Sequence, residues 1–422
     1  MTKRLLALLS VLVIASMALT ACGGAAGGGG GGAGTLKIVS SLPMTGASLT
    51  QTQTIVNAEQ LRLEQAGNKA CGGKYNIAYE AWDDASAALG KWDPAVETEN
   101  ANKAAADKSI VAYLGTFNSG AAKLSIPILN QAGPLVMISP ANTYPGLTVA
   151  APGITVEGEP DKYYPSGVRN YARVAPADIY QSKVLAKFMT DLGVKSLYIV
   201  DDQEAYGKGI ADATEADAKA AGINVVGHEG FDPKAADYKA LMTKISTSNA
   251  GGPPDAVFAG SIVDNNLAQL IKDKVAIMGP NDTVKFIVPD GGYTQATIDG
   301  AGKDVAAGVF GTTPGLALKD LGPNGAKFRT DYEAKYGHLT EPYAVLGYDT
   351  MSAALKAIED VCAAGGNPTD RKAVRDAVFA IKDFDGALGK WSFDANGDIN
   401  LPYYLAGQVK DGAFTDYKTY TP

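Results

Sequence analysis

Short apolar runs alternate with segments of helical periodicity from residue 35 to the C-terminus. The runs are rich in Val, Ile and Tyr and end in polar turns, so they predict strands. Between them, apolar residues recur at three- and four-residue spacing, as in residues 238–245 behind Asp237, a candidate N-cap, and in residues 267–278. The predicted strands form two series: residues 36–43, 75–84, 110–117 and 134–141, and then residues 170–176, 195–202, 223–230, 254–261 and 283–290.

Strands that alternate with helices predict right-handed βαβ units and parallel sheets. Because there are two series, we expect an α/β fold with two lobes. Residues 144–170, near the junction of the series, are rich in Pro and Gly without periodicity and predict a long surface insertion. Near the C-terminus, residues 386–398 and 402–414 predict two strands joined by a turn at Asn396-Gly397.

The N-terminus has the pattern of an export signal. Lys3 and Arg4 precede an uncharged apolar stretch that ends at about Ala21. The alternative, a transmembrane anchor, is disfavoured because the stretch is at the short edge of the roughly 18 apolar residues that a span needs. We therefore predict that residues 1–21 are a signal peptide.

The end of this signal predicts a lipid anchor. Residues 19–22, Leu-Thr-Ala-Cys, resemble the lipobox of bacterial lipoproteins, in which the cysteine receives a diacylglyceryl group and becomes the first mature residue. Cys22 would then hold the protein at the membrane through two acyl chains. The glycine-rich residues 22–34 predict a flexible linker, since no strand precedes them as a phosphate-binding loop would require.

Composition and charge exclude some partners. With 422 residues, 46% of them hydrophobic, the chain can bury a core and form more than one domain. Its formal net charge of -8 falls to -10 when Lys3 and Arg4 leave with the signal, so we expect no binding of nucleic acid. Cys71 and Cys362 remain after processing, and in an exported protein such a pair more often forms a disulfide than a metal or catalytic site. Their positions in the sequence leave open whether they meet.

Catalytic motifs are absent from the sequence. It has two histidines, His228 and His338, and no H-E-x-x-H, G-x-S-x-G or G-x-x-x-x-G-K-[ST] pattern. We interpret both histidines as hydrogen-bonded or solvated. Residues 394–398 lack the spacing of an EF-hand and predict a turn. We therefore expect no enzymatic activity, no cofactor and no bound metal.

Polar side chains follow several predicted strands, where open α/β sheets bind their ligands. These turns contain hydroxyls, amides and single acids, in residues 43–48, 115–120, 138–143, 201–207 and 289–292. Hydroxyls and helix N-termini suit a carboxylate, and an acid suits an ammonium, so the set predicts a site for a small zwitterion. The alternative for any one of these residues is that it only caps a helix.

From about Thr35 to Pro422 the chain resembles the type 1 periplasmic binding proteins of the Leu/Ile/Val-binding kind, the solute receptors of ABC importers. The matching stretches are PMTG, DDAS, GTFNSG, ISPANT, YGKGIA, VPDG and YDTMSAAL, in that order. The resemblance implies two Rossmann-like lobes with parallel sheets, three inter-lobe crossings and a ligand cleft that closes by lobe movement. It implies an N-terminal lobe of residues 35–174 and 315–398 and a C-terminal lobe of residues 175–314 and 399–422.

The resemblance also implies the residues that bind the carboxylate of the ligand. Ser119 and Thr143 would contact it, with Asn118 beside Ser119. The backbone around Ala141 and Asn142 would assist.

On the other side of the cleft, the resemblance implies Tyr206 and Asp290, with Asp290 facing the α-ammonium. Three departures from the family leave open which ligand side chain the pocket would accept. Ile262 stands in place of an aromatic, residues 50–52 (Thr-Gln-Thr) replace an aromatic of the first loop, and Asp290 is one methylene shorter than the usual Glu.

From this resemblance we expect an extracytoplasmic, lipid-anchored receptor that binds a branched-chain or other small amino acid, or a close analogue. The alternatives are a ligand-sensing surface receptor and a binder of amides, urea or aromatic acids on the same fold. The expected partners are ABC permease subunits, and we expect a monomer. Because the family's chain tracing returns the helix near Tyr343 to the first lobe, we predict a disulfide between Cys71 and Cys362.

Overall fold

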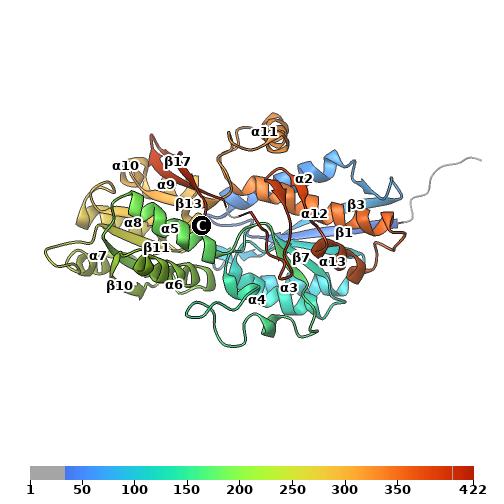
Figure 1. Ribbon diagram of the computed structural model, residues 1–422, viewed down its shortest axis with the longest axis horizontal. Helices are drawn as coiled ribbons and strands as arrows, with labels where there is room; N and C mark the ends of the chain where they lie inside the picture. Colours follow the sequence, from blue (N-terminus) through green and yellow to red (C-terminus); the bar gives the residue numbers. More distant parts are fainter. Residues whose placement is uncertain (1–33, 402) are drawn as a thin grey trace, which may run out of the picture.

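The computed structural model describes residues 34–401 and 403–422, which form two α/β lobes, each built around its own sheet (Figure 1). The two sheets lie toward opposite ends of the elongated molecule, the first among the blue and orange elements and the second among the green and yellow ones. The predicted signal peptide, Cys22 and nearly all of the glycine-rich linker lie outside the described residues.

The first lobe contains a six-stranded sheet in the order β2-β3-β1-β6-β7-β8. Only β2 is antiparallel to its neighbour, so the sheet is mostly parallel as expected. The central strands β1, β6 and β7 are mostly buried, as a sheet covered on both faces requires. The strands of this sheet are β1 (Gly34–Leu42), β2 (Lys69–Ala70), β3 (Tyr75–Asp83), β6 (Ile110–Gly115), β7 (Val136–Ser139) and β8 (Tyr171–Arg173).

Helices cover both faces of this sheet. On one face lie α2 (Leu49–Gln65), α11 (Pro323–Tyr336), α12 (Tyr343–Ala363) and α13 (Arg371–Phe379), whose buried side chains form one apolar cluster with the strands. On the other face lie α3 (Pro94–Ala106) and α4 (Ser119–Asn130). Because α11, α12 and α13 come late in the chain, the core of the first lobe joins both ends of the sequence (Figure 1).

The second lobe contains a seven-stranded sheet in the order β10-β9-β11-β12-β13-β16-β17. The first five of these strands are parallel, and β16 and β17 are antiparallel at one edge. One apolar cluster joins the sheet to α5 and α6, and another joins it to α7, α8, α9 and α10. The bounds are β9 (Ser196–Asp201), β10 (Asn224–Gly230), β11 (Ala256–Gly260), β12 (Lys285–Val288), β13 (Phe310–Pro314), β16 (Tyr404–Lys410), β17 (Ala413–Tyr420), α5 (Asp178–Asp191), α6 (Ala205–Ala220), α7 (Lys239–Ile245), α8 (Leu267–Met278), α9 (Gln295–Ala301) and α10 (Lys303–Ala306).

The chain passes between the two sheets three times, after β8, after β13 and before β16. A buried ion pair lies beside two of these passages, with Arg173 Nε 2.6 Å from Asp398 Oδ1. Thr148 of the insertion donates to the same carboxylate over 2.9 Å. The first and third crossings are therefore held against the insertion by one charged cluster. The expected lobe boundaries at residues 174, 314 and 398 stay predictions.

The insertion, residues 144–170, is more than a surface loop. It contains two short 3₁₀ turns, η1 (Pro145–Leu147) and η2 (Asp161–Tyr163), and its tyrosines join the apolar cluster beneath α4. Glu159 lies at its centre and accepts hydrogen bonds from Tyr144 over 2.7 Å and Tyr163 over 2.6 Å. The absence of sequence periodicity hid this packing, because the buried residues follow no regular element.

Two sequence-based predictions about strands are wrong. The stretch 170–176 does not open the second series, because β8 pairs with β7 and completes the first sheet. The turn at Asn396-Gly397 does not join two long strands, since it closes only the single bridge between Phe393 and Ile399. The flanking strands have other partners: β15 (Gly389–Trp391) pairs with β14 (Phe384–Gly386), and β16 pairs with β13 and β17.

The predicted start of α7 is displaced by one residue. Tyr238 is the N-cap, while the side chain of Asp237, one residue earlier, accepts a hydrogen bond from the backbone N–H of Lys239 over 3.2 Å. An acidic side chain can satisfy a first-turn N–H from either position, so the pattern predicted the helix but not its first residue.

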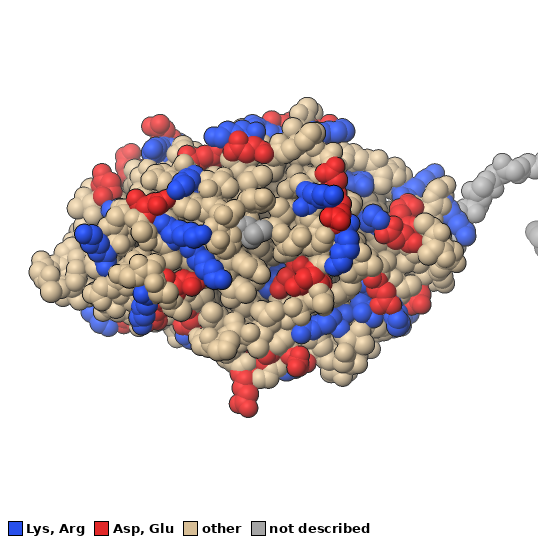
Figure 2. Space-filling view, viewed as in Figure 1, with Lys and Arg blue, Asp and Glu red and all other residues tan. Residues whose placement is uncertain are grey.

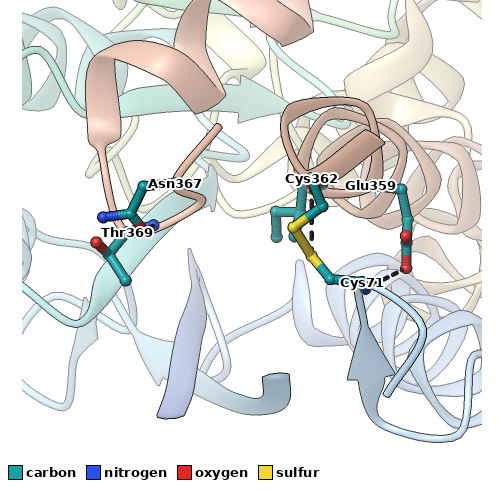
Figure 3. Close-up of a disulfide and its surroundings, with 6 residues drawn as sticks. Cys71, Glu359, Cys362, Asn367 and Thr369 are labelled. Carbon is teal, nitrogen blue, oxygen red and sulfur yellow. Dashed lines mark hydrogen bonds between the residues drawn. A yellow bond between two sulfur atoms is a disulfide. The ribbon is translucent and has the colours of Figure 1, made fainter. Parts of the chain in front are cut away.

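A disulfide joins Cys71 to Cys362 across 291 residues of sequence, with their Cα atoms 5.6 Å apart (Figure 3). Cys71 follows β2, and Cys362 lies at the end of α12. Glu359, one turn before Cys362, accepts a hydrogen bond from the backbone N–H of Cys71 over 2.8 Å. The pairing predicted from the resemblance is thus present in the structure, and it ties the two ends of the first lobe's core together.

Candidate ligand-binding site

A small cavity lies between the lobes, at the carboxyl ends of strands from both sheets. Its volume is about 20 Å³, near the room that one water molecule needs. First-lobe residues after β6 and β7 and at the start of α12 face second-lobe residues from α6 and from the loops after β11 and β12. The lining consists of Phe117, Asn118, Ser119, Ala141, Tyr206, Ile262, Asp290, Gly291 and Tyr343. Six of the eight predicted ligand-binding residues belong to it, namely Asn118, Ser119, Ala141, Tyr206, Ile262 and Asp290.

The first-lobe side of the cavity presents a helix N-terminus. Asn118 is the N-cap of α4, and its side chain makes no capping bond. The N–H groups of the first helical turn have no partner within the helix, and the helix dipole adds a partial positive charge. Ser119, the first residue of α4, places a hydroxyl at the same point. Together these groups suit an anion such as a carboxylate.

Asn142 and Thr143 are buried but do not line the cavity. Asn142 has a structural role, since its Nδ2 donates to the carbonyl oxygen of Phe117 over 2.9 Å. The backbone N–H groups of Ala141 and Asn142 both donate to Ser139 Oγ, over 3.0 and 2.8 Å. Thr143 Oγ1 is buried without a hydrogen-bond partner among the described residues. Of this turn, only Ala141 lines the cavity, while the hydroxyl of Thr143 faces Asp178.

On the second-lobe side, two tyrosines hold the carboxylate of Asp290. Tyr206 donates to its Oδ1 over 2.6 Å, and Tyr343 donates to its Oδ2. Burial and the charge of Asp290 raise the pKa of both phenols well above the usual range, so both stay protonated donors. Because Tyr206 comes from the second lobe and Tyr343 from the first, the carboxylate joins the two lobes. Tyr343 was missed in the sequence, where it begins an apolar helix and no polar pattern marks it.

Asp290 is not a helix cap, which was the alternative explanation for an acid at this position. It lies in a 3₁₀ turn, η3 (Asp290–Gly292), four residues before Thr294. Thr294 caps α9 by accepting a hydrogen bond from the N–H of Ala296. Glu341 of the first lobe accepts one from the N–H of Gln295 over 3.1 Å. The helix is therefore capped without Asp290.

Asp178, the first residue of α5, is a second buried acid near the site. Neither of its carboxylate oxygens has a hydrogen-bond partner among the described residues. Burial and then the neighbouring charge of Asp290 raise the pKa of Asp178 well above its usual range. Burial also raises the pKa of Asp290, although the hydrogen bonds from its two tyrosines oppose the effect. Asp178 was not among the predicted site residues. Like Asp290, however, it follows an apolar stretch that was predicted to be a strand, residues 170–176.

No cation balances these acids within the cavity wall, since no Lys or Arg belongs to the lining. Arg173 interacts with Asp178 electrostatically, but its guanidinium is paired with Asp398. Two carboxyls with raised pKa values favour a ligand that brings positive charge, because its ammonium would stabilise their ionised form.

Contacts at the mouth of the cleft join the lobes outside the cavity. A small hairpin of the first lobe, β4 (Ala85–Ser86) and β5 (Lys91–Trp92), reaches the second lobe. Lys91 Nζ lies 2.5 Å from Glu204 Oε1 and 2.6 Å from Asn265 Oδ1. Trp92 Nε1 donates to Glu204 Oε2 over 3.0 Å. The structure therefore has its lobes closed.

Other features of the molecule lie apart from this cavity. A hollow of about 360 Å³, lined mainly by apolar residues of both lobes near the second crossing, contains none of the predicted site residues. His228 is hydrogen-bonded as expected, with its ring nitrogens 2.6 Å from Glu215 and 3.2 Å from Asp201. Within residues 34–401 and 403–422, no three His, Cys, Asp or Glu side chains are placed to hold a metal ion, and no helix is both long and apolar enough to span a bilayer. Acidic and basic side chains are interspersed on the face shown in Figure 2.

Sequence comparison finds relatives along almost the whole chain. A model of the periplasmic binding protein family matches residues 35–413. The Leu/Ile/Val-binding protein BraC3 of Rhizobium johnstonii is 27% identical over 360 residues, which cover 85% of this chain and 87% of that protein. A Pseudomonas aeruginosa protein described as an amino acid binding protein is 25% identical, with 82% of this chain and 87% of the relative covered.

Solved structures share the fold. A leucine-binding protein from Thermotoga maritima matches with a TM-score of 0.76 and 23% identity, covering 92% of this chain and 99% of that one. A solute-binding protein of an R. palustris ABC transporter, in complex with benzoate, matches with a TM-score of 0.73 and 21% identity, covering 92% and 97%. One structure of this fold is thus named a leucine-binding protein and another holds benzoate, so the ligand must be argued from the residues of the site.

Proposed function

Because the chain belongs to the periplasmic binding protein family, we propose that it is the extracytoplasmic solute receptor of an ABC importer and closes its lobes over a small amino acid or close analogue. Its relatives in Rhizobium johnstonii and Pseudomonas aeruginosa carry names of amino acid receptors. The ligand would leave chemically unchanged, in line with the absence of catalytic motifs from the sequence.

The observation that carries this proposal is the opposition of Asp290 and the N-terminus of α4 across one buried cavity. A zwitterion has a charge for each side, its carboxylate toward Ser119 and its ammonium toward Asp290. Such a ligand contacts both lobes only when they are closed, and it therefore stabilises the closed state. The cavity is too small to admit an amino acid as it stands, so entry requires the lobes to move apart.

Individual roles follow from this arrangement. Asn118 and Ser119, with Thr143 behind them, would hold the carboxylate. Asp290 would accept from the ammonium while Tyr206 keeps its carboxylate in place, and Asp178 would add a second negative charge. Phe117, Ala141, Ile262 and Tyr343 would surround the rest of the ligand, as members of the cavity lining.

Partners and location are part of the same proposal. Cys22 would carry the lipid anchor, the glycine-rich linker would separate the receptor from the membrane, and the closed lobes would dock on ABC permease subunits. We propose a monomer, because each chain carries a complete cleft. The interspersed surface charges offer no extended basic patch for nucleic acid on the face shown (Figure 2).

Titration calorimetry with the standard amino acids tests the proposal. At least one should bind the wild-type protein, and Asp290→Ala should weaken its binding by roughly two orders of magnitude, since a buried ammonium would lose its partner. Asp282→Ala, which removes an exposed carboxylate from the same lobe, is the matched control and should bind normally. Unchanged affinity in Asp290→Ala, or a best ligand without an amine such as an aromatic carboxylate, would overturn the proposal.

A further inference from the structure

Some of the buried side-chain oxygens without a hydrogen-bond partner among the described residues lie in the cavity wall or around Asp290. Five of them belong to carboxamides or carboxylates: Gln51 Oε1, Asn118 Oδ1, Asp178 Oδ1, Asp178 Oδ2 and Gln181 Oε1. All four side chains are at least nine-tenths buried. An acceptor kept from water and from protein donors is unfavourable, so each of these oxygens favours a ligand that donates to it.

Each of these residues either lines the cavity or lies near Asp290, which lines it. Asn118 belongs to its lining. Gln51, on α2, donates through Nε2 to the backbone oxygen of Asp290 over 3.4 Å, which places its carboxamide across from that residue. Gln181 lies one turn after Asp178 on α5 and, like Asp178, interacts with the carboxylate of Asp290.

The hydrogen bonds that the amide nitrogens of Gln51 and Gln181 donate show which way each carboxamide is turned. Gln51 Nε2 faces the carbonyl oxygen of Asp290, and Gln181 Nε2 faces both the carbonyl oxygen and the hydroxyl of Thr312, 3.4 and 2.9 Å away. Flipping either amide would set one oxygen against another. Their oxygens are therefore available as acceptors.

The hydroxyl of Thr143 has no other partner among the described residues and faces Asp178, so it can donate to one of these oxygens. The other protein donors near them are already in use. The phenols of Tyr206 and Tyr343 donate to Asp290, and no basic side chain lines the cavity. An α-ammonium brings three N–H groups. Three donors cannot satisfy the four acceptors that then remain in addition to Asp290, so the site has more acceptor capacity than the ammonium of an aliphatic amino acid can fill.

We propose that the ligand carries further N–H donors: it is a small amino acid whose side chain ends in a carboxamide or a cationic nitrogen, and not a branched-chain amino acid. This inference rests on the proposed function and specifies its ligand. Gln51 supports it independently, because it stands in the segment where the resemblance predicts an aromatic side chain and offers an amide in place of an apolar surface.

Isosteric ligands test the inference on the unmodified protein. L-asparagine and L-leucine have side chains of the same shape, and L-glutamine and L-methionine have similar lengths. Titration calorimetry should find L-asparagine or L-glutamine, or an amino acid with a cationic side chain, at least tenfold tighter than its aliphatic counterpart. Equal or tighter binding of L-leucine, L-isoleucine or L-valine would overturn the inference.

Two variants locate the effect. Gln51→Leu and Asn118→Leu each remove an acceptor at nearly constant volume, and each should lower the preference for the nitrogen-bearing ligand several-fold while thermal unfolding confirms a folded protein. If both variants keep the wild-type preference, the acceptors do not set it and the inference fails. If leucine binds best and Asp290→Ala abolishes its binding, the proposed function stands and only this inference falls. If no amino acid binds the wild type, both fall.

Discussion

Asp264 of the second lobe accepts hydrogen bonds from Ser48, the N-cap residue of α2 in the first lobe. One carboxylate oxygen accepts from the backbone N–H of Ser48 over 3.0 Å and from that of Ala47 over 2.6 Å, and the other accepts from the Ser48 hydroxyl. The side chain of Ser48 makes no capping bond within its own helix. A helix of one lobe thus has a carboxylate of the other lobe at its N-terminus. The helix dipole favours negative charge at this end of the helix.

This contact exists only while the lobes are closed, so Asp264→Ala should favour the open form. A lost cap of about 1 kcal/mol corresponds to a roughly fivefold loss of ligand affinity, although Asp264 does not line the cavity. Calorimetry gives the affinity, and small-angle scattering of the ligand-free protein should give a larger radius of gyration. Asp264→Asn keeps an acceptor and is the control. Wild-type affinity in Asp264→Ala would mean that the contact does not contribute to closure.

Lys91 and Glu204 form a second contact across the cleft mouth, with both side chains about one-fifth exposed. Lys91→Met should increase the ligand dissociation rate a few-fold, since partly exposed ion pairs contribute up to about 1 kcal/mol. Stopped-flow displacement measures this rate, and the effect should shrink at high salt. Lys208→Met removes a lysine paired with Asp212 within α6, so it controls for the loss of charge alone. An equal effect in both variants would contradict a role in closure.

The disulfide should make a large contribution to stability, because it closes a loop of 291 residues. The chain-entropy model gives about 5 to 6 kcal/mol for loops of this size. Cys71→Ser/Cys362→Ser should therefore unfold at markedly lower urea concentration than the wild type, while ligand affinity stays unchanged because the bond is remote from the cavity lining. Thiol titration of unfolded, unreduced wild-type protein should detect neither Cys71 nor Cys362. Two reactive thiols there would refute the bond in solution.

The membrane anchor is tested by Cys22→Ala expressed from the full-length sequence. If Cys22 is acylated, the variant should leave the membrane fraction and still bind ligand, because the glycine-rich linker separates the anchor from the lobes. Fractionation followed by immunoblotting measures this. Persistent attachment to the membrane would indicate that the apolar N-terminal stretch is a true span.

Glu59 should make the first lobe less stable as the pH rises. It is fully buried and accepts a hydrogen bond from Tyr79 over 2.5 Å, and burial raises its pKa from 4.5 to about 8. A carboxyl with a raised pKa binds more protons in the folded than in the unfolded state, so its stabilising effect is present below pH 4.5 and is lost as the pH rises to about 8. Urea unfolding of Glu59→Gln, compared with the wild type, should show the variant gaining relative stability between pH 5 and pH 8. A difference that is the same at both pH values would contradict the shift.

Local sequence patterns were sufficient to predict most of the helices and strands of this protein and part of its candidate site. Short runs rich in Val, Ile and Tyr predicted the parallel strands, and period-3.6 repeats of apolar residues predicted the helices that cover them, because each element must bury its apolar surface whatever its neighbours are. The strand-end rule led to Ser119 and Asp290 for a similar reason, since parallel strands bring their carboxyl ends to one edge of a sheet. The same rule applies to Asp178, but the turn after residues 170–176 was not among the polar turns that were singled out.

The sequence by itself determined the two-lobed α/β class and the polar turns that could form a site, since these depend on residues near one another in the chain. Only the tertiary structure decided which strands pair at the sheet edges, as β16 does with β13. It also decided that Tyr343 reaches Asp290 from the other lobe, and that Gln51 and Asp178, whose oxygens are unpartnered, both lie near Asp290. The physical reason is that such contacts join residues tens to hundreds of positions apart, and their energies depend on burial and on charges that no local window of sequence contains.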